Sequence, residues 1–542
     1  MTLIRLAGGL LAVMLLGLIL GTGTSPATAG IAGFTVNTSL DDPDNTALGD
    51  GVCDTGEGVC SLRAAIQELN AFGGTHTITV PAGTYSLSWG LAGEDAAAGG
   101  DLDLTAAGLT IQGAGAASTI IQKSGGPSTH RVFDVISGDH TISGVTVQNG
   151  LGDDGDGGGI RIGSGSSLTL VSTRVSGNSA GATGYGGGIH NMGTLVLSDS
   201  TISGNSASGG ALGGGISNDF SGTARVIGST ISGNTAGVFG LGGGIRNRGG
   251  LIVHNTTLSG NIASDGGGIS NIDPGFVNVT SSTLANNTGG GILVDGTTML
   301  TNTILVNPGD FNCNVALGMT SLGYNIDSGN TCGLNGAGDL VNTDPALGAL
   351  ASNGGPTQTH SPLPGSPAVD AGSPAAPGSG GTSCPVKDQR NLNRPADGNG
   401  DLTVRCDIGA VEACPAAPDG DGDFIGDACD NCPAGSNGLQ EDYDGDNAGN
   451  ACDAPGGGNV DCSDDVNSVD ALKVLRSNAG LSVSQEEPCQ NIGLDLDGGG
   501  LMGDVDCSGA VNSVDALKIL RATSGLSVSK PPGCPPLIVF KK

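Results

Sequence analysis

Short alternating patterns of apolar and polar residues fill the middle of the chain and repeat at a regular interval. Segments such as 194–197 (Thr-Leu-Val-Leu) and 200–203 (Ser-Thr-Ile-Ser) alternate with the period of a β-strand, and no segment there has a helical period. A Gly-Gly-Gly-Ile signature recurs at intervals of 29, 27, 29, 24 and 23 residues, ending at Ile160, Ile189, Ile216, Ile245, Ile269 and Ile292. A repeat of this length indicates a solenoid, a propeller or an array.

Each repeat contains about three short strands separated by Gly, Asn or Asp. A repeat of this length has too few residues for a four-stranded propeller blade. We therefore interpret one repeat as one rung of a parallel β-helix. The 102 glycines fit tight corners, because Gly adopts positive φ at little steric cost. Asparagines recur in two registers and predict side-chain ladders along the axis, at Asn191, Asn218, Asn247 and Asn271 and at Asn178, Asn205, Asn234, Asn261 and Asn287.

Residues 1–29 read as an export signal. Arg5 precedes an apolar run from Leu6 to Leu20, and Ala27-Thr-Ala offers a small-residue cleavage site. The alternative is a membrane anchor, but the run is shorter than the roughly 20 residues that a span needs. We expect a secreted protein with no transmembrane segment after signal cleavage.

Fourteen cysteines agree with an oxidising compartment. Sequence alone does not fix their connectivity. They fall into sequential pairs at 53/60, 313/332, 384/406, 414/429, 432/452, 462/489 and 507/534.

The formal net charge of −32 makes nucleic acid an improbable partner, because binding phosphates requires a basic surface. Much of the acidity lies after residue 415 in ordered spacings, which indicates cation ligands.

Residues 30–90 predict a cap and first rung, with a short amphipathic helix over 61–70 and Ser61 as its N-cap. A helix over the open end of a solenoid protects its exposed backbone edge. The segment Cys60-Ser-Leu-Arg-Ala-Ala-Ile-Gln-Glu resembles the CSLREA segment of many secreted bacterial β-helix proteins, differing at Ala64. The resemblance implies a pectate-lyase-like, right-handed parallel β-helix, an all-β solenoid, with its rungs over 91–342.

Residues 343–414 resemble the "choice-of-anchor Q" segment that closes many such proteins. The likeness lies in the Asp344-Pro-Ala-Leu-Gly stretch and in Cys406-Asp-Ile-Gly-Ala-Val-Glu. The resemblance implies surface association more than chemistry.

Residues 415–455 carry carboxylates at alternate positions, which converge when the chain winds around a hard cation such as Ca²⁺. The two copies resemble thrombospondin type 3 repeats; the alternative is a disordered acidic linker. The predicted Ca²⁺ ligands here are Asp419, Asp421, Asp423, Asp427, Asp430, Asp442, Asp444, Asp446 and Asp453.

Residues 456–542 contain two further loops with ligand-capable side chains at positions 1, 3, 5, 9 and 12, each followed by a helix, as in EF-hand loops. The pair resembles a type I dockerin, a small α domain, which implies a cohesin-like module or the cell envelope as partner. The alternative is a Ca²⁺-stiffened stalk without such a partner. The implied ligands are Asn459, Asp461, Ser463, Asn467, Asp470, Asp504, Asp506, Ser508, Asn512 and Asp515.

Catalytic signatures of pectin-degrading β-helices are missing: there is no Asn-Thr-Asp, no Asp-Asp followed by Gly-His-Gly, and no Arg-Ile-Lys. Residues that follow the repeated Ile are the best remaining candidates, with His190, Asp219 and Arg246 as weak catalytic ones. The sequence favours a β-helix that binds a polysaccharide or a protein and attaches through its tail. The alternative is a polysaccharide lyase or hydrolase delivered by that tail.

Overall fold

The computed structural model describes residues 33–56, 58–89, 95–125, 129–152, 156–316, 318–399 and 403–414, and short stretches beyond them (420–422, 426–427, 430, 432–436, 468–478, 495–496, 500–501 and 513–523). The predicted export signal lies outside these residues.

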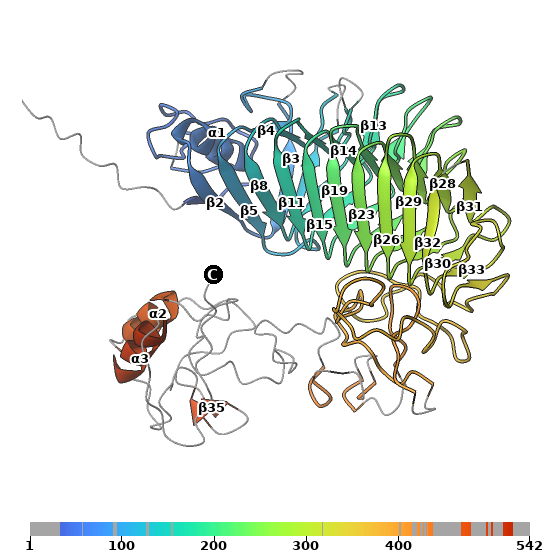
Figure 1. Cartoon of the computed structure of the whole chain (residues 1–542). Coiled ribbons are helices and arrows are strands. Elements are labelled where there is room, and N and C mark those ends of the chain that lie inside the picture. Colours follow the sequence, from blue (N-terminus) through green and yellow to red (C-terminus); the bar gives the residue numbers. More distant parts are fainter. Residues whose placement is uncertain are drawn as a thin grey trace, which may run out of the picture. The chain divides into compact units, whose positions relative to one another are not determined.

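Residues 33–341 coil through three parallel sheets, which we name sheets I, II and III (Figure 1). Sheet I contains β1 (Gly33–Thr35), β2 (Thr75–Val80), β5 (Gly108–Gly113), β8 (Asp139–Ser143), β11 (Ser167–Val171), β15 (Thr194–Ser198), β19 (Thr223–Ile227), β23 (Gly250–His254), β26 (Phe276–Thr280), β29 (Thr297–Thr301) and β32 (Met319–Gly323). Sheet II contains β3 (Gly83–Leu87), β6 (Thr119–Lys123), β9 (Thr146–Gln148), β12 (Arg174–Ser176), β16 (Thr201–Ser203), β20 (Thr230–Ser232), β24 (Thr257–Ser259), β27 (Thr283–Ala285), β30 (Ile304–Val306), β33 (Ile326–Asp327) and β34 (Leu340–Val341). Sheet III contains β4 (Leu102–Leu104), β7 (Phe133–Val135), β10 (Ile160–Ile162), β14 (Ile189–Asn191), β18 (Ile216–Asn218), β22 (Ile245–Asn247), β25 (Ile269–Asn271), β28 (Ile292–Val294) and β31 (Cys313–Val315).

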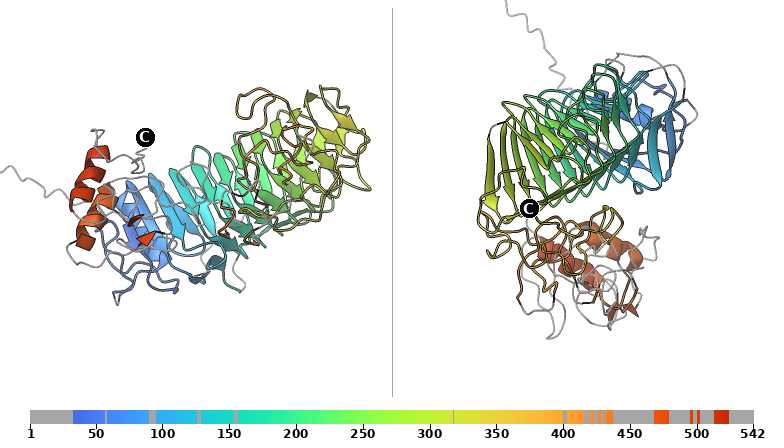
Figure 2. Two further views of the ribbon diagram at one scale, coloured as in Figure 1. Left: turned by 90° about the horizontal axis from the view of Figure 1, so that it is seen from below. Right: turned by 90° about the vertical axis from the view of Figure 1, so that its right-hand side faces the viewer.

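Each rung passes through sheets III, I and II in turn, and the strands of successive rungs lie side by side (Figure 2). Three rungs add a two-residue strand after sheet II, in a small sheet of β13 (Ser179–Ala180), β17 (Ser206–Ala207) and β21 (Thr235–Ala236). The predicted rungs are confirmed: Ile160 pairs with Ile189, and each later signature isoleucine pairs with the next one along the chain. These isoleucines are buried in the core, as period-2 alternation requires.

Both predicted asparagine ladders are present. In one, the Nδ2 of Asn178 donates to the Oδ1 of Asn205 at 3.0 Å, and the pattern continues to Asn307 and Asn312, beyond the predicted members. In the other, Asn191 begins a series that donates along the axis at 2.7–2.9 Å. Because each side chain joins adjacent rungs, the ladders fix the register of the stack.

Helix α1 (Leu62–Phe72) covers the end of the stack where β2 and β4 lie (Figure 1), as predicted. The Oγ of Ser61 accepts the N–H of Ala64 at 3.0 Å and caps the helix. Arg63 is fully buried, with its Nε 2.7 Å from Asp41 Oδ1, and it also donates to the carbonyl of Gly100. Arg63 thus joins the helix to two chain segments that a sequence pattern alone does not connect, one through the ion pair and one through the hydrogen bond.

The closing segment, residues 343–414, lies against the outer face of sheet II. Gln389 donates to the carbonyl of Ser229 at 3.0 Å and accepts from the hydroxyl of Thr257 at 2.6 Å. His360 Nε2 lies 2.8 Å from Ser259 Oγ, and burial lowers the pKa of this imidazole. The segment therefore fastens several rungs together across the coil.

A buried cluster of one ion pair and several hydrogen bonds, which we name the Arg394 cluster, lies at the end of the closing segment. Arg394 lies 3.3 Å from Glu412 and donates to the carbonyls of Asp407 and Gly409 at 3.0 and 2.8 Å. Glu412 also accepts the N–H groups of Asp407 and Ala396. Burial raises the pKa of the Asp407 carboxyl well above its usual value, and the nearby charge of Glu412 raises it further.

Disulfides join Cys53 to Cys60, Cys313 to Cys332 and Cys384 to Cys406, which confirms three of the predicted pairs. Cys414 and Cys432 are also disulfide-bonded. The other cysteines of the four remaining predicted pairs lie outside the described residues.

In the tail, α2 (Ser468–Asn478) and α3 (Ser513–Thr523) contact each other, and β35 (Asp495–Leu496) pairs antiparallel with β36 (Gly500–Leu501). Each helix covers the Ala-Leu-Lys-(Val/Ile)-Leu-Arg segment where the sequence predicted one. Within the described residues, none of the helices has the length and apolar character that crossing a bilayer requires.

Candidate functional site

The central residues of the sheet III strands form one line across successive rungs, which we name the central row. Their registers follow from the strand pairing and join Asp103, Asp134, Arg161, His190, Ser217, Arg246, Ser270 and Leu293. The flanking isoleucines point into the core, so the central side chains project from the opposite face of the sheet. Two of the sequence candidates, His190 and Arg246, thus stand two strands apart in one row.

His190 and Arg246 meet through Tyr185. The ring of Tyr185 lies 5.7 Å from the imidazole of His190, and the guanidinium of Arg246 lies 4.8 Å from the Tyr185 ring centroid. Arg246 also donates to Ser217 Oγ at 3.0 Å, and burial lowers the pKa of this arginine. The side chains of His190 and Arg246 are only 3% and 5% exposed, so this cluster is largely enclosed.

Asp156 supports the same cluster from a neighbouring loop. Its Oδ2 lies 3.4 Å from His190 Nδ1, and its Oδ1 accepts the N–H of Tyr185 at 2.9 Å. Burial acts to raise the pKa of Asp156, but the contacts with His190 and Tyr185 outweigh it, and the pKa lies below its usual value. The signature spacing gave no signal for Asp156, because it precedes the Gly-Gly-Gly-Ile mark.

Asp219, the third candidate, follows β18 and lies between two arginines. Its Oδ1 is 3.8 Å from Arg246 Nη1 and 3.9 Å from Arg248 Nη1. Asp219 and Arg248 are 35% and 40% exposed, so they form the accessible edge of the charged cluster. The structure therefore brings the three sequence candidates to one face, although only Asp219 reaches solvent.

An acidic cluster occupies the other end of the central row. Asp101, Asp103 and Asp134 each offer an oxygen within 4.8 Å of the others, a spacing that could hold a metal ion. Arg131 Nη1, however, lies 2.5 Å from Asp134 and 3.6 Å from Asp101, and Arg161 donates to Asp134 at 2.9 Å. Because two guanidinium groups already offset the carboxylates, we interpret the cluster as a buried ion-pair network.

The turns from sheet III to sheet I alternate in length over six rungs. Long turns take seven residues from strand start to strand start (Ile160 to Ser167, Ile216 to Thr223, Ile269 to Phe276), and short turns take five (Ile189 to Thr194, Ile245 to Gly250, Ile292 to Thr297). The step from sheet I to sheet II is seven residues in all six rungs. The corner between sheets III and I therefore carries protruding and recessed turns in alternation.

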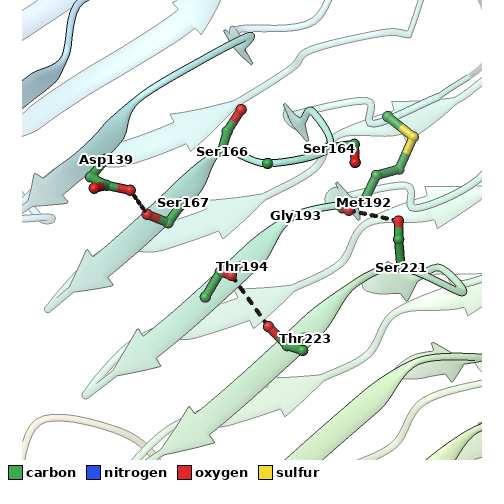
Figure 3. Close-up of a pocket in the computed structure, with 10 residues that line it drawn as sticks. Asp139, Ser164, Ser166, Ser167, Met192, Gly193, Thr194, Ser221 and Thr223 are labelled. Carbon is green, nitrogen blue, oxygen red and sulfur yellow. Dashed lines mark hydrogen bonds between the residues drawn. The ribbon is translucent and has the colours of Figure 1, made fainter.

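A polar recess, which we name the corner groove, lies over the first short turn (Figure 3). Its volume is about 290 Å³. The lining is mostly hydroxyl groups with one carboxylate and one thioether: Asp139, Ser164, Gly165, Ser166, Ser167, Met192, Gly193, Thr194, Ser221 and Thr223. Ser167 donates to Asp139, and Thr223 Oγ1 donates to Thr194 Oγ1 at 3.3 Å.

Two exposed phenylalanines lie on the same corner of the coil as the groove, although neither of them lines it. Phe220, 66% exposed, precedes the groove residue Ser221 in the second long turn. Phe276, 39% exposed, belongs to the same sheet I row as Thr194 and Thr223, with Gly250 between Thr223 and Phe276. Apolar faces beside hydroxyl groups are suited to a ligand with the same mixed character, such as a sugar ring.

Most of the predicted Ca²⁺ ligands lie outside the described residues. Of those inside, Asp427 accepts the N–H of Gly420 and Asp430 accepts the N–H of Cys432, both at 2.7 Å. Asp421 is also described, and Asp470 and Asp515 fall within α2 and α3. The ligands beyond the described residues are Asp419, Asp423, Asp442, Asp444, Asp446, Asp453, Asn459, Asp461, Ser463, Asn467, Asp504, Asp506, Ser508 and Asn512.

Comparison with known proteins bears on the coil. A model of the right-handed β-helix region matches residues 134–307, and no curated protein sequence matches the chain. Two solved structures are similar: pectate lyase Pel9A, 14% identical over 71% of this chain and 97% of that chain with a TM-score of 0.37, and ORF18 of Geobacillus virus E2, 14% identical over 50% and 58% with a TM-score of 0.24. Both are too distant to bear on substrate or mechanism. Residues 134–307 thus form a right-handed parallel β-helix.

Proposed function

We propose that this chain is a glycan-binding β-helix and that a sugar occupies the corner groove. The observation that carries the proposal is the combination, on one edge of the coil, of a hydroxyl-lined recess with exposed phenyl rings. Sugars present hydroxyl groups around their rims and C–H groups on their faces, so they need hydrogen-bonding and apolar partners together. This edge of the coil supplies both, with hydroxyl groups in the groove and phenyl rings at Phe220 and Phe276.

The polar groups of the groove can donate and accept. A serine or threonine hydroxyl can do both, but Ser167, Ser221 and Thr223 already donate within the protein and keep their lone pairs as acceptors. The carboxylate of Asp139 is a further acceptor and strengthens a hydrogen bond from a sugar hydroxyl. Ser221 already donates to the carbonyl of Met192 at 2.8 Å, which holds its Oγ with a lone pair to spare. Such a set recognises hydroxyls without requiring a charged ligand.

Catalysis by the central row is the competing function. A general base must come within about 2.6–3.2 Å of the proton that it removes. His190 has the supporting carboxylate of Asp156, but its side chain is 3% exposed and lies against Tyr185. The enclosed position of His190 favours binding over turnover.

Replacing Phe220 or Phe276 by alanine should weaken glycan binding about 3- to 10-fold each, because each change removes a stacking face. The measurement is affinity electrophoresis in gels containing β-1,4-glucan, xylan, alginate or polygalacturonate. Phe311→Ala is the matched control, since this phenylalanine is 65% exposed but lies before β31, away from the corner. Failure of every polymer to retard the wild-type protein would reject glycan binding.

We also propose that the protein is exported and that its tail binds Ca²⁺ and docks a cohesin-like module. The three disulfides support export, because such bonds persist in oxidising surroundings. Docking is supported by apolar side chains on both tail helices: Leu472 and Leu517 are 54% and 56% exposed, while Val474 and Ile519 are buried. Two similar exposed faces are available for a protein partner.

Chelation should destabilise the tail and abolish its docking, because Ca²⁺ holds together loops rich in carboxylates. We expect EDTA to lower the tail's melting temperature and Ca²⁺, but not Mg²⁺ at equal concentration, to restore it. EDTA applied to a cohesin column that holds the protein should release it. A melting curve unchanged by EDTA would argue for an acidic linker in place of a Ca²⁺ domain.

A further inference from the structure

The turn pattern at the corner groove recurs two rungs away. The groove lies over the short turn at Gly193, between the long turns that hold Ser164 and Phe220. The next short turn, at Gly249, lies between the long turns of Phe220 and Pro274 in the same way. Because the turn at Gly249 is two residues shorter than its two neighbours, this corner is expected to be set back between them, and we name it the second recess.

Both recesses have floors that only glycine fits. A Cβ on Gly193 would lie 2.3 Å from the carbonyl oxygen of Ser166, and a Cβ on Gly249 would lie 2.1 Å from that of Gly222. The chain therefore passes close beneath the rung before it at both turns. By contrast, the tips of the flanking long turns are exposed, including Gly165, Phe220 and Pro274.

The side chains of the second recess are also suited to sugars. Arg248 and Asp219, 3.9 Å apart and both over a third exposed, offer a donor and an acceptor to neighbouring hydroxyls. Phe276 adds an apolar face where the sheet I row leaves Gly250 open, since a Cβ there would meet only the Thr223 methyl at 3.8 Å. The first recess uses Met192 in the position that Arg248 takes here.

We infer that the ligand is an extended β-1,4-linked glycan that runs along the coil axis, with equivalent rings in the two recesses. Two strand spacings amount to about 9.5 Å, a length that two linked pyranose rings span. In a β-1,4 chain each ring is turned over relative to the one before it, so the same face returns at every second ring. The two-rung period of the turns matches this two-ring period. The inference rests on the proposed glycan binding and adds the linkage class and the direction of the chain.

Isothermal titration with gluco-oligosaccharides of β-1,4 linkage tests the inference. The tetrasaccharide should bind at least about tenfold more tightly than the disaccharide, because it reaches both recesses at once. Maltotetraose (α-1,4) and laminaritetraose (β-1,3) should show no such gain over their disaccharides, because their repeats do not match the turns.

Two equivalent substitutions separate the recesses. Thr194→Phe and Gly250→Phe place a phenyl ring at the first sheet I residue after each short turn, in the same row two strands apart. Because the added ring fills one recess, each variant should bind the tetrasaccharide no more tightly than the wild type binds the disaccharide. The double variant should bind neither oligosaccharide. Thr84→Phe, at an exposed position of β3 in sheet II, is the control.

The outcomes distinguish this inference from the function on which it rests. Equal affinities for disaccharide and tetrasaccharide, or a complete loss in one single variant, would mean a single sugar site and overturn the inference alone. A length gain shared by maltotetraose or laminaritetraose would overturn the linkage class. Loss of all binding to any glycan in the wild type would reject the proposed function itself. Melting temperatures show whether each variant is folded.

Discussion

Replacing Asn234 by alanine is expected to destabilise the coil by about 3–5 kcal/mol, a large effect for one neutral side chain. Asn234 is fully buried, and its Oδ1 accepts from both the backbone N–H and the Nδ2 of Asn205 at 3.0 and 2.9 Å. Its Nδ2 donates to the carbonyl of Ile202 and to Asn261 Oδ1. Alanine would leave these neighbours with unmet hydrogen bonds in the core, each costing about 1–3 kcal/mol.

Urea denaturation of the full chain measures the loss for Asn234→Ala. Asn278→Ala is the matched control, because this asparagine is half-buried on sheet I and its Oδ1 accepts only a long 3.5 Å contact from Thr280. The control should change stability by less than about 0.5 kcal/mol. Similar midpoints for the two variants would mean that the ladder contributes little beyond its packing.

Arg394→Met should destabilise the closing segment by about 3–5 kcal/mol, because it leaves the buried carboxylate of Glu412 without its cation. Both side chains of this pair are fully buried and lie 3.3 Å apart. Methionine keeps much of the arginine's length, so the cost arises from the unpaired charge and from the carbonyls of Asp407 and Gly409, which lose their donor.

The effect of Arg394→Met is measured by limited proteolysis, which gives the cleavage rate, and by calorimetry, which gives the melting temperature. Cleavage within 343–414 should become faster, while the rungs of the coil stay resistant. Arg174→Met, at an exposed position of β12, is the control for loss of one positive charge and should be cut at the wild-type rate. A melting temperature of Arg394→Met equal to that of the wild type would mean that the Arg394 cluster adds no net stability.

The sequence predicted the rungs because each repeats the same local rules. The Gly-Gly-Gly-Ile signature and the ladder asparagines occur once per rung, so a period in the chain becomes a row in space. The same logic placed His190 and Arg246 on one face. What the register did not reveal was depth: loops that carry Asp156 and Tyr185 enclose these two side chains.

Contacts between distant segments could not be predicted in this way. Gln389 meets Ser229 across 160 residues, and Arg63 meets the carbonyl of Gly100 across 37, with no repeat to signal either. The alternating turns at the corner groove could have been predicted, because the steps after each signature isoleucine can be counted in the sequence. His190, Asp219 and Arg246 were predicted instead, because imidazole, carboxylate and guanidinium groups are common in catalytic sites. The groove is lined mostly by serine and threonine, which occur throughout the repeats.

The alternation of the turns also constrains how such a coil can lengthen. Because the step between sheets I and II is seven residues in each of the six rungs with alternating turns, a copy of one of these rungs would keep its inward side chains in register. Tandem duplication of a single rung, however, would place two long or two short turns next to each other and break the order of the edge. Duplication of a pair of rungs would extend the edge with its alternation intact, so two rungs are the smallest unit by which this edge can grow and keep its order.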